Sequence, residues 1–261
     1  MRYSSNALRH QLFVAAAVVA AHSTAGASGF RQKDVRFLVE LFSNWVESSS
    51  SSGLIVQNTQ VIRYLDSLIK EGYARRLPRD KPPTYRLTRT GLLELLARII
   101  DPDNARTPEQ FLFALFFIRN YRSKIQDLVI AEGTLFPRSL KIELDTLLDC
   151  RELLRREISR THQQLKRLEL RIEDNIKASE RVSTGLRRGQ PFEELVCEVE
   201  KLYPYELNSQ KPLSELIHLI PAENRTWELT EGFKGRVDCI WRPMRKQLRE
   251  YLETLQELER L

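Results

Sequence analysis

The sequence has few of the residues from which metal centres and covalent catalysts are built. It holds three cysteines and four histidines, none of which has the close spacing of zinc ligands, and no glycine-rich phosphate loop occurs. We therefore expect no metal, no cofactor and no enzymatic activity. The cysteines, Cys150, Cys197 and Cys239, are odd in number and far apart, which is typical of a reducing compartment and indicates a cytoplasmic protein.

Long apolar runs are also missing, since the stretch from Phe111 to Ile118 is far shorter than the roughly 18 residues of a membrane-spanning helix. We therefore expect no membrane partner. The opening segment allows two interpretations. Arginines, the apolar run from Leu12 to Ala21 and small residues ending at Ala27 follow the layout of a secretory signal peptide. The alternative is a first helix from Asn6 to His22 with its apolar residues on one side, and the elements that follow favour this helix.

Positive charge is concentrated at one end of the chain. Residues 1 to 100 hold 14 Lys and Arg and 7 Asp and Glu, whereas the remaining residues hold 27 and 28. The net charge of +6 is therefore confined to the first hundred residues. A basic segment joined to a neutral one indicates that the first segment meets a polyanion, and the alternative is a basic surface without a nucleic-acid partner.

Two further amphipathic helices are predicted before residue 72. Asn58 is a favourable cap for a helix from Thr59 to about Glu71, and Gly72 ends it. Its predicted core positions are Val61, Leu65, Leu68 and Ile69. The earlier helix, Phe30 to Val46, has apolar residues at steps of three and four that predict one buried side: Val35, Leu38, Leu41, Phe42 and Trp45.

Two short strands, Tyr73 to Leu77 and Thr84 to Thr88, and a helix from Gly91 to Ile100 complete this segment. The stretch Val61 to Leu77 (VIRYLDSLIKEGYARRL), followed by Tyr85 to Gly91 (YRLTRTG), resembles the winged helix-turn-helix regulators of the PadR and MarR kind. The shared features are Leu-x-x-Leu, a Lys/Glu-Gly-hydrophobic helix end and Tyr-x-Leu-Thr-x-x-Gly. The resemblance covers about 45 residues and implies a winged-helix DNA-binding domain over residues 1–100, with a small β wing.

The outward side chains of the Thr59 to Glu71 helix suit a major groove. Gln60 can bond adenine and Arg63 can bond guanine by paired hydrogen bonds. Arg79 and Lys81 lie between prolines on the loop joining the two strands, where a stiff cationic wing reaches the minor groove or the backbone. The residues expected to contact double-stranded DNA are Thr59, Gln60, Arg63, Ser67, Lys70, Arg75, Arg76, Arg79, Lys81 and Arg86.

Residues 101–261 are predicted to form an all-helical body. A capping box at Thr107 starts a helix to about Glu132, whose apolar stretch from Phe111 to Ile118 should be buried. A shorter helix is expected from Phe192 to Leu202. Ser139 to about Val182 carries a heptad pattern, and one helix of that length spans about 65 Å, so a coiled-coil partner is expected.

That partner can be a second copy or the last helix of the same chain, in an antiparallel hairpin. The last helix has its own stripe and a possible restart at Pro243. The residues expected to pair copies in a homodimer are Leu140, Leu144, Leu147, Leu154, Ile158, Leu165, Leu168, Ile172, Trp241, Leu248 and Leu255, while Arg151, Thr161 and Asn175 interrupt the pattern. The sequence thus predicts a dimeric DNA-binding regulator, a repressor by preference. The alternatives are a winged-helix adaptor for protein partners and an exported coiled-coil protein.

Overall fold

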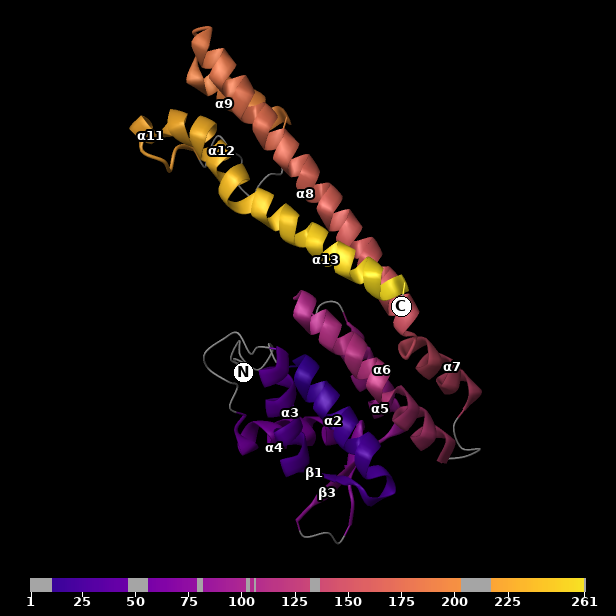
Figure 1. Ribbon diagram of the computed structural model, residues 1–261. Helices are drawn as coiled ribbons and strands as arrows, with labels where there is room; N and C mark the ends of the chain where they lie inside the picture. The colour runs from indigo at the N-terminus through magenta and orange to yellow at the C-terminus, as the bar shows by residue number, and fades with distance from the viewer. Residues whose placement is uncertain are drawn as a thin grey trace. The chain divides into compact units, whose positions relative to one another are not determined.

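The computed structural model describes residues 11–46, 56–78, 82–101, 104–105, 107–131, 137–202 and 217–260, and the chain is mainly helical (Figure 1). This confirms the expected class, in which helices dominate and strands are few. The chain divides into two compact units, unit 1 (Met1–Leu154) and unit 2 (Arg155–Leu261). The division falls later than the boundary expected after residue 100, because the helices between residues 108 and 147 pack against the first hundred residues.

Unit 1 contains a small sheet within a set of helices. Its elements follow in this order: α2 (Gln11–Ala25), the 3₁₀ turn η1 (Gly26–Ser28), β1 (Phe30–Arg31), α3 (Gln32–Val46), α4 (Asn58–Lys70), β2 (Ala74–Arg76), β3 (Thr84–Leu87), α5 (Arg89–Ile100), α6 (Pro108–Ala131), α7 (Arg138–Leu147) and the first residues of α8 (Cys150–Arg187).

Helix α2 is the centre of unit 1 and is buried on every side. Leu12, Phe13 and the run from Ala15 to Ala21 are at most 4% exposed. Alanine is the commonest residue in this run, and its small side chain lets α3, α5 and α6 pack closely around the helix. The expectation of a single apolar face was wrong, and residues 6–10 of the predicted helix lie outside the described residues. Cleavage at Ala27, as in a secretory signal, would remove the central helix of this unit.

The three strands form an antiparallel sheet in the order β1-β3-β2. The register pairs Phe30 with Tyr85 and Ala74 with Leu87, and all four residues are buried. Because side chains alternate along a strand, the residues between them face the opposite side of the sheet.

Strand β1 replaces the first two residues of the helix expected from Phe30. Gly29 has a φ of 76°, and the carbonyl oxygen of Tyr85 lies 3.0 Å from the position that a Cβ on Gly29 would take. This close approach brings Phe30 alongside β3. Helix α3 then begins at Gln32, and the Asp34 carboxylate accepts a hydrogen bond from the backbone N–H of Arg31 at 2.9 Å.

The single helix predicted from Ser139 to Val182 is instead two helices. Helix α7 ends at Leu147, and α8 begins at Cys150 and continues to Arg187. Asp149 causes the restart, since its carboxylate accepts hydrogen bonds from the backbone N–H groups of Arg151 at 3.0 Å and Glu152 at 3.2 Å.

Unit 2 consists of helices only among the residues that the structure describes there. After α8 come α9 (Phe192–Leu202), α11 (Ala222–Trp227), the π-helical turn η3 (Glu228–Gly232), α12 (Phe233–Arg236), a second π-helical turn η4 (Val237–Trp241) and α13 (Arg242–Arg260). The π turn η4 ends at Trp241 and α13 begins at Arg242, one residue before Pro243, where a restart of the last helix was expected.

Helices α8 and α13 pack antiparallel along each other within the chain (Figure 1). Ion pairs join Arg155 to Glu259 at 3.4 Å and Arg249 to Glu169 at 2.5 Å. Further along α8, the Ser179 hydroxyl donates to the carbonyl oxygen of Thr230 at 3.0 Å. The residue numbers rise along one helix as they fall along the other, so the two helices are antiparallel. This is the intrachain hairpin, one of the two arrangements that the sequence allowed.

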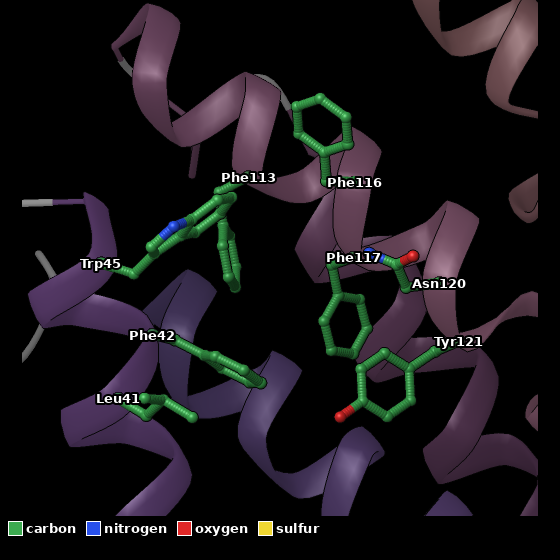
Figure 2. Close-up of a pocket in the computed structure, with 8 residues that line it drawn as sticks. All are labelled: Leu41, Phe42, Trp45, Phe113, Phe116, Phe117, Asn120 and Tyr121. Atoms are coloured by element: carbon green, nitrogen blue, oxygen red, sulfur yellow. The ribbon is translucent and has the colours of Figure 1, made fainter.

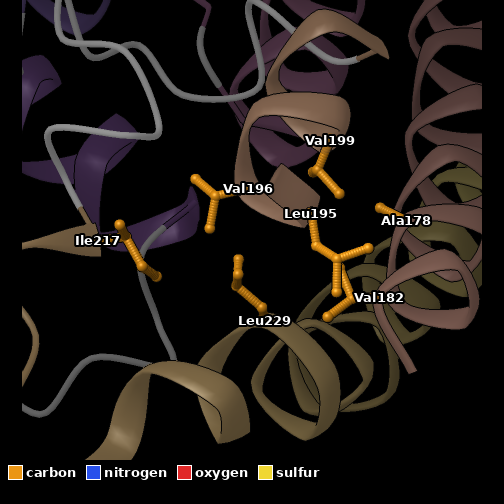
Figure 3. Packing of buried hydrophobic residues seen from close by; sticks show 7 residues of the cluster. All are labelled: Ala178, Val182, Leu195, Val196, Val199, Ile217 and Leu229. Atoms are coloured by element: carbon orange, nitrogen blue, oxygen red, sulfur yellow. The ribbon is translucent and has the colours of Figure 1, made fainter. Parts of the chain in front are cut away.

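Two apolar clusters fill this hairpin. One contains Leu168, Ile172 and Val237, with Trp241 and Leu248 packed against it. The other closes the far end between α8, α9 and the chain leading into α12, as Figure 3 shows. Its buried members are Ala178, Val182, Leu195, Val196, Val199, Ile217 and Leu229.

The residues expected to pair two copies are therefore divided between unit 1 and unit 2. Leu140, Leu144, Leu147 and Leu154 belong to unit 1. Ile158, Leu165, Leu168 and Ile172 on α8, with Trp241, Leu248 and Leu255, lie in the hairpin of unit 2, where Leu168, Ile172 and Val237 cluster inside one chain. Of the polar positions, Thr161 and Asn175 are buried at 0% and 1% exposure, whereas Arg151 is exposed.

Glu157 is a carboxylate at the edge of the hairpin core. It is 9% exposed, accepts a hydrogen bond from the Tyr251 hydroxyl at 3.2 Å and pairs with Arg160 at 3.3 Å. Burial raises the pKa of Glu157 above its ordinary value, although Arg160 and Tyr251 act in the opposite direction. The charged form is therefore less favourable in the folded chain than in the unfolded chain.

This predicts the pH dependence of Glu157→Gln. Above the raised pKa the buried carboxylate lowers the free energy of unfolding, and protonation removes the penalty as the pH falls through that pKa. The variant, whose amide oxygen still accepts from Tyr251, should be more stable than the parent at about pH 7, and the difference should shrink towards about pH 4.5. Urea unfolding at both pH values measures it. A difference that grows on acidification would contradict the raised pKa.

Candidate nucleic-acid interface

The start of α4 is held by a cap and by α3. The cap is Gln57, whose backbone N–H donates to Oε1 of Gln60 at 3.2 Å, rather than the expected Asn58. Asn58 instead accepts hydrogen bonds from α3, at its backbone oxygen from Gln32 at 3.0 Å and at Oδ1 from Arg36 at 3.3 Å. The amide oxygen of Gln60 is thus engaged in the cap, which weakens its expected paired bonding to adenine.

The end of α4 is a left-handed glycine turn. Gly72 has a φ of 77°, and its backbone N–H donates to the carbonyl oxygen of Ile69 at 3.1 Å. The N–H of Tyr73 donates to the carbonyl oxygen of Leu68 at 2.8 Å. These two bonds form a Schellman motif, which satisfies the last helix carbonyls and turns the chain directly into β2.

Arg98 on α5 fixes the other side of α4. Its guanidinium pairs with Glu94 at 3.0 Å and with Glu71 at 3.5 Å, and it lies 5.7 Å from the ring centroid of Tyr73. It also forms a hydrogen bond with the hydroxyl of Tyr64, and burial raises the pKa of Tyr64 to about 12. Arg98 therefore links the body and the end of α4 to a buried helix of the core.

The segment from Leu87 to Gly91 (LTRTG) holds the glycine turn after α4 in place. The Thr88 hydroxyl accepts from the backbone N–H of Gly91 at 3.1 Å, which caps α5, and donates to the carbonyl oxygen of Gly72 at 2.9 Å. A Cβ on Gly91 would lie 1.9 Å from the carbonyl oxygen of Tyr73, so only glycine fits there. The pattern ties the end of α4, the start of β2 and the start of α5 into one junction.

Gly91→Ala should therefore destabilise unit 1 by about 3 kcal/mol, because the obstructing atom belongs to the backbone and moves little. Gly235→Ala is the matched control. Gly235 is also helical, and nothing lies within 4 Å of its added Cβ, so that substitution should leave stability unchanged or raise it by up to about 1 kcal/mol. Urea unfolding followed by circular dichroism measures both, and equal effects would show that the Tyr73 contact is unimportant.

The outward face of α4 is polar but mixed. Thr59, Gln60, Arg63 and Lys70 are exposed as expected, while Val61, Leu65 and Leu68 are buried. Ser67 is only half-exposed, and its hydroxyl donates to the carbonyl oxygen of Tyr64 at 2.7 Å. Asp66 and Ile62 also lie on the exposed side, with Ile62 at 38% exposure, so the face is not made of donors alone.

The sheet contributes a group of arginines. Arg75 and Arg86 lie directly opposite each other on β2 and β3, and Arg31 pairs with Thr84 on the same face of the sheet. Arg31 and Arg75 are exposed and Arg86 is half-buried. Three arginines thus lie on one face of this small sheet. We call Arg31, Arg75 and Arg86 the arginine face.

Arg31 was missed because the two residues of β1 are too few to show a strand pattern in the sequence. Arg76 is exposed but pairs with Tyr85, which places it on the alternate position of the strand. The expected wing residues Arg79 and Lys81 lie outside the described residues.

A second surface feature of unit 1 is an aromatic groove of about 280 Å³ between α3 and α6. Its walls are side chains that face one another in Figure 2, chiefly Leu41, Phe42 and Trp45 from α3 and Phe113, Phe116, Phe117 and Tyr121 from α6. The stretch from Phe111 to Ile118, expected to be buried, is mostly so, but Phe111, Leu112 and Phe116 are half-exposed. The clustering of Phe113, Phe116 and Phe117 at helical spacing was the available sequence signal.

In the described part of the chain, no group of three His, Cys, Asp or Glu side chains is arranged to hold a metal ion. Across the same residues, every helix is too short or too polar to cross a bilayer. No family model, no curated protein and no solved structure matches this chain. Its function is therefore argued from its own residues.

Proposed function

We propose that unit 1 is a winged helix-turn-helix module that binds double-stranded DNA, and that the protein is a transcriptional regulator. The order helix, strand, helix, helix, strand, strand, with the sheet order β1-β3-β2, supports this assignment. In it, α4 is the recognition helix and the hairpin of β2 and β3 is the wing.

The arginine face is the observation that carries the proposal. Arg31, Arg75 and Arg86 place three guanidinium groups on one face of the sheet, and guanidinium groups are common donors to phosphate oxygens of DNA. The wing follows α4 directly through Gly72, so a polar helix face and a cationic sheet are joined by a rigid turn. Rigid positioning is what base reading requires, since a helix that rotates cannot hold a paired hydrogen bond.

The residues divide into two roles. Arg63 on the exposed face of α4 reads a base edge, by preference guanine. Lys70, Arg75, Arg86 and Arg31 neutralise phosphates and set the position of the module on the duplex. Gln60 contributes at most through its amide nitrogen, because its oxygen holds the cap.

The test measures binding of the full chain to a duplex selected from a random pool and to an unrelated duplex, across salt concentrations. Arg63→Ala should weaken binding to the selected duplex by about 1–3 kcal/mol and leave the unrelated duplex nearly unchanged. Arg75→Ala should weaken both and reduce the slope of log affinity against log salt by about one.

Arg119→Ala is the matched control, since Arg119 is an exposed arginine of unit 1 on α6, which contributes no residue to the proposed site. It should leave both affinities unchanged. Absence of duplex binding even at low salt would reject the proposal and favour the protein adaptor.

A further inference from the structure

Helix α3 has an apolar outward face. Val35, Val39 and Ser43 point into unit 1 and define its buried side. On the opposite side, one turn apart from each other, Phe37, Leu41 and Trp45 are 64%, 49% and 61% exposed. We call these three residues the α3 stripe.

The α3 stripe is large for a surface that meets only water. With roughly 200 Å² for a large apolar side chain, these exposed fractions leave roughly 350 Å² of apolar surface on three residues. The stripe is in the range of the largest apolar patch of a soluble protein, about 300–600 Å², and such a patch often has a function. A stable interface buries about 800 Å² on each partner, so the stripe supplies nearly half, and the adjoining groove adds to it.

Helix α3 therefore carries an exposed phenylalanine and, together with α6, one wall of the aromatic groove. Phe37 projects from the first half of α3, while the groove opens beside Leu41, Phe42 and Trp45 in the second half (Figure 2). An apolar cavity of about 150 Å³ accommodates a benzene ring. The groove of about 280 Å³ is thus large enough for a phenylalanine side chain.

We propose that the occupant of this surface is a second copy of the chain. Two α3 helices pack antiparallel about a two-fold axis at Leu41, and each Phe37 enters the groove beside Trp45 of the partner. The stripe is symmetric about Leu41, with one large residue four positions before and one four positions after. An antiparallel copy therefore presents the same pattern in reverse, as an isologous interface requires.

Charge does not oppose this packing. Arg36 and Glu40 neutralise each other in an ion pair of 3.0 Å, and Lys33 and Asp34, about one turn before Phe37, carry opposite charges. The groove lining contains no charged side chain among the described residues, and Asn120 and the Tyr121 hydroxyl are its polar groups. The assignment rests on α3 and α6 alone and does not depend on DNA binding.

Sedimentation equilibrium of the full chain tests the proposal. The wild-type protein should be a dimer, and Phe37→Glu or Leu41→Glu should weaken dimerisation at least about 100-fold, since each substitution places a charge twice in the apolar interface. Leu170→Glu on α8 is the matched control, because Leu170 is 51% exposed, close to the 49% of Leu41. It should leave the dimer intact, and circular dichroism should show all three variants folded.

Disulfide crosslinking tests the symmetry. Leu41→Cys lies on the proposed axis and should form a covalent dimer under mild oxidation, at a yield well above that of the wild type with its own three cysteines. Lys33→Cys, two turns away on the same helix, should not. A monomeric wild-type protein, a dimer that survives Leu41→Glu, or absence of the Leu41→Cys crosslink would each overturn the assignment. Duplex binding by a monomer would leave the proposed function standing while this inference fails.

Discussion

The all-round burial of α2 is the constraint on which the rest of unit 1 depends. A helix made of Leu, Phe, Ala and Val has no face for water, so other elements must cover it on all sides. Helices α3, α5 and α6 and strand β1 do so, and each also carries part of the surface chemistry. The positions of the groove, the arginine face and α4 follow from packing around this one helix.

Helix α4 illustrates how that core reaches the surface. Its buried residues Val61, Leu65 and Leu68 set its rotation, its two caps set its ends, and Arg98 and Thr88 connect it to α5. Each of these bonds contributes about as much to the free energy of unfolding as any single hydrogen bond. Together they hold the helix in one orientation. The outward position of Arg63 is therefore a consequence of buried groups rather than of any contact made by Arg63 itself.

Local signals in the sequence were sufficient for the elements whose causes are local. Helix α4 differs from the prediction by one residue at each end, and α9 begins and ends at the predicted residues, because their apolar spacing is encoded within the segment. Strand β1 was missed because two residues carry no periodicity, and its existence depends on a carbonyl of β3 more than fifty residues later. The break at Asp149 was missed because the apolar repeat continues across it, while one capping carboxylate starts a new helix there.

Two apolar stripes show what a periodic pattern leaves open. On α8 the heptad pattern allowed either a second copy or the last helix as partner, and α13 and the turn before it cover Leu168 and Ile172 within one chain. On α3 the apolar residues indicated one buried side, yet they encircle most of the helix, so that Val35 faces the core while Leu41 and Trp45 face away from it. Periodicity reports that an apolar face exists and leaves open which surface covers it. Because α13 covers α8 within the chain, the apolar face available to a second copy is the one on α3, where Phe37, Leu41 and Trp45 are exposed.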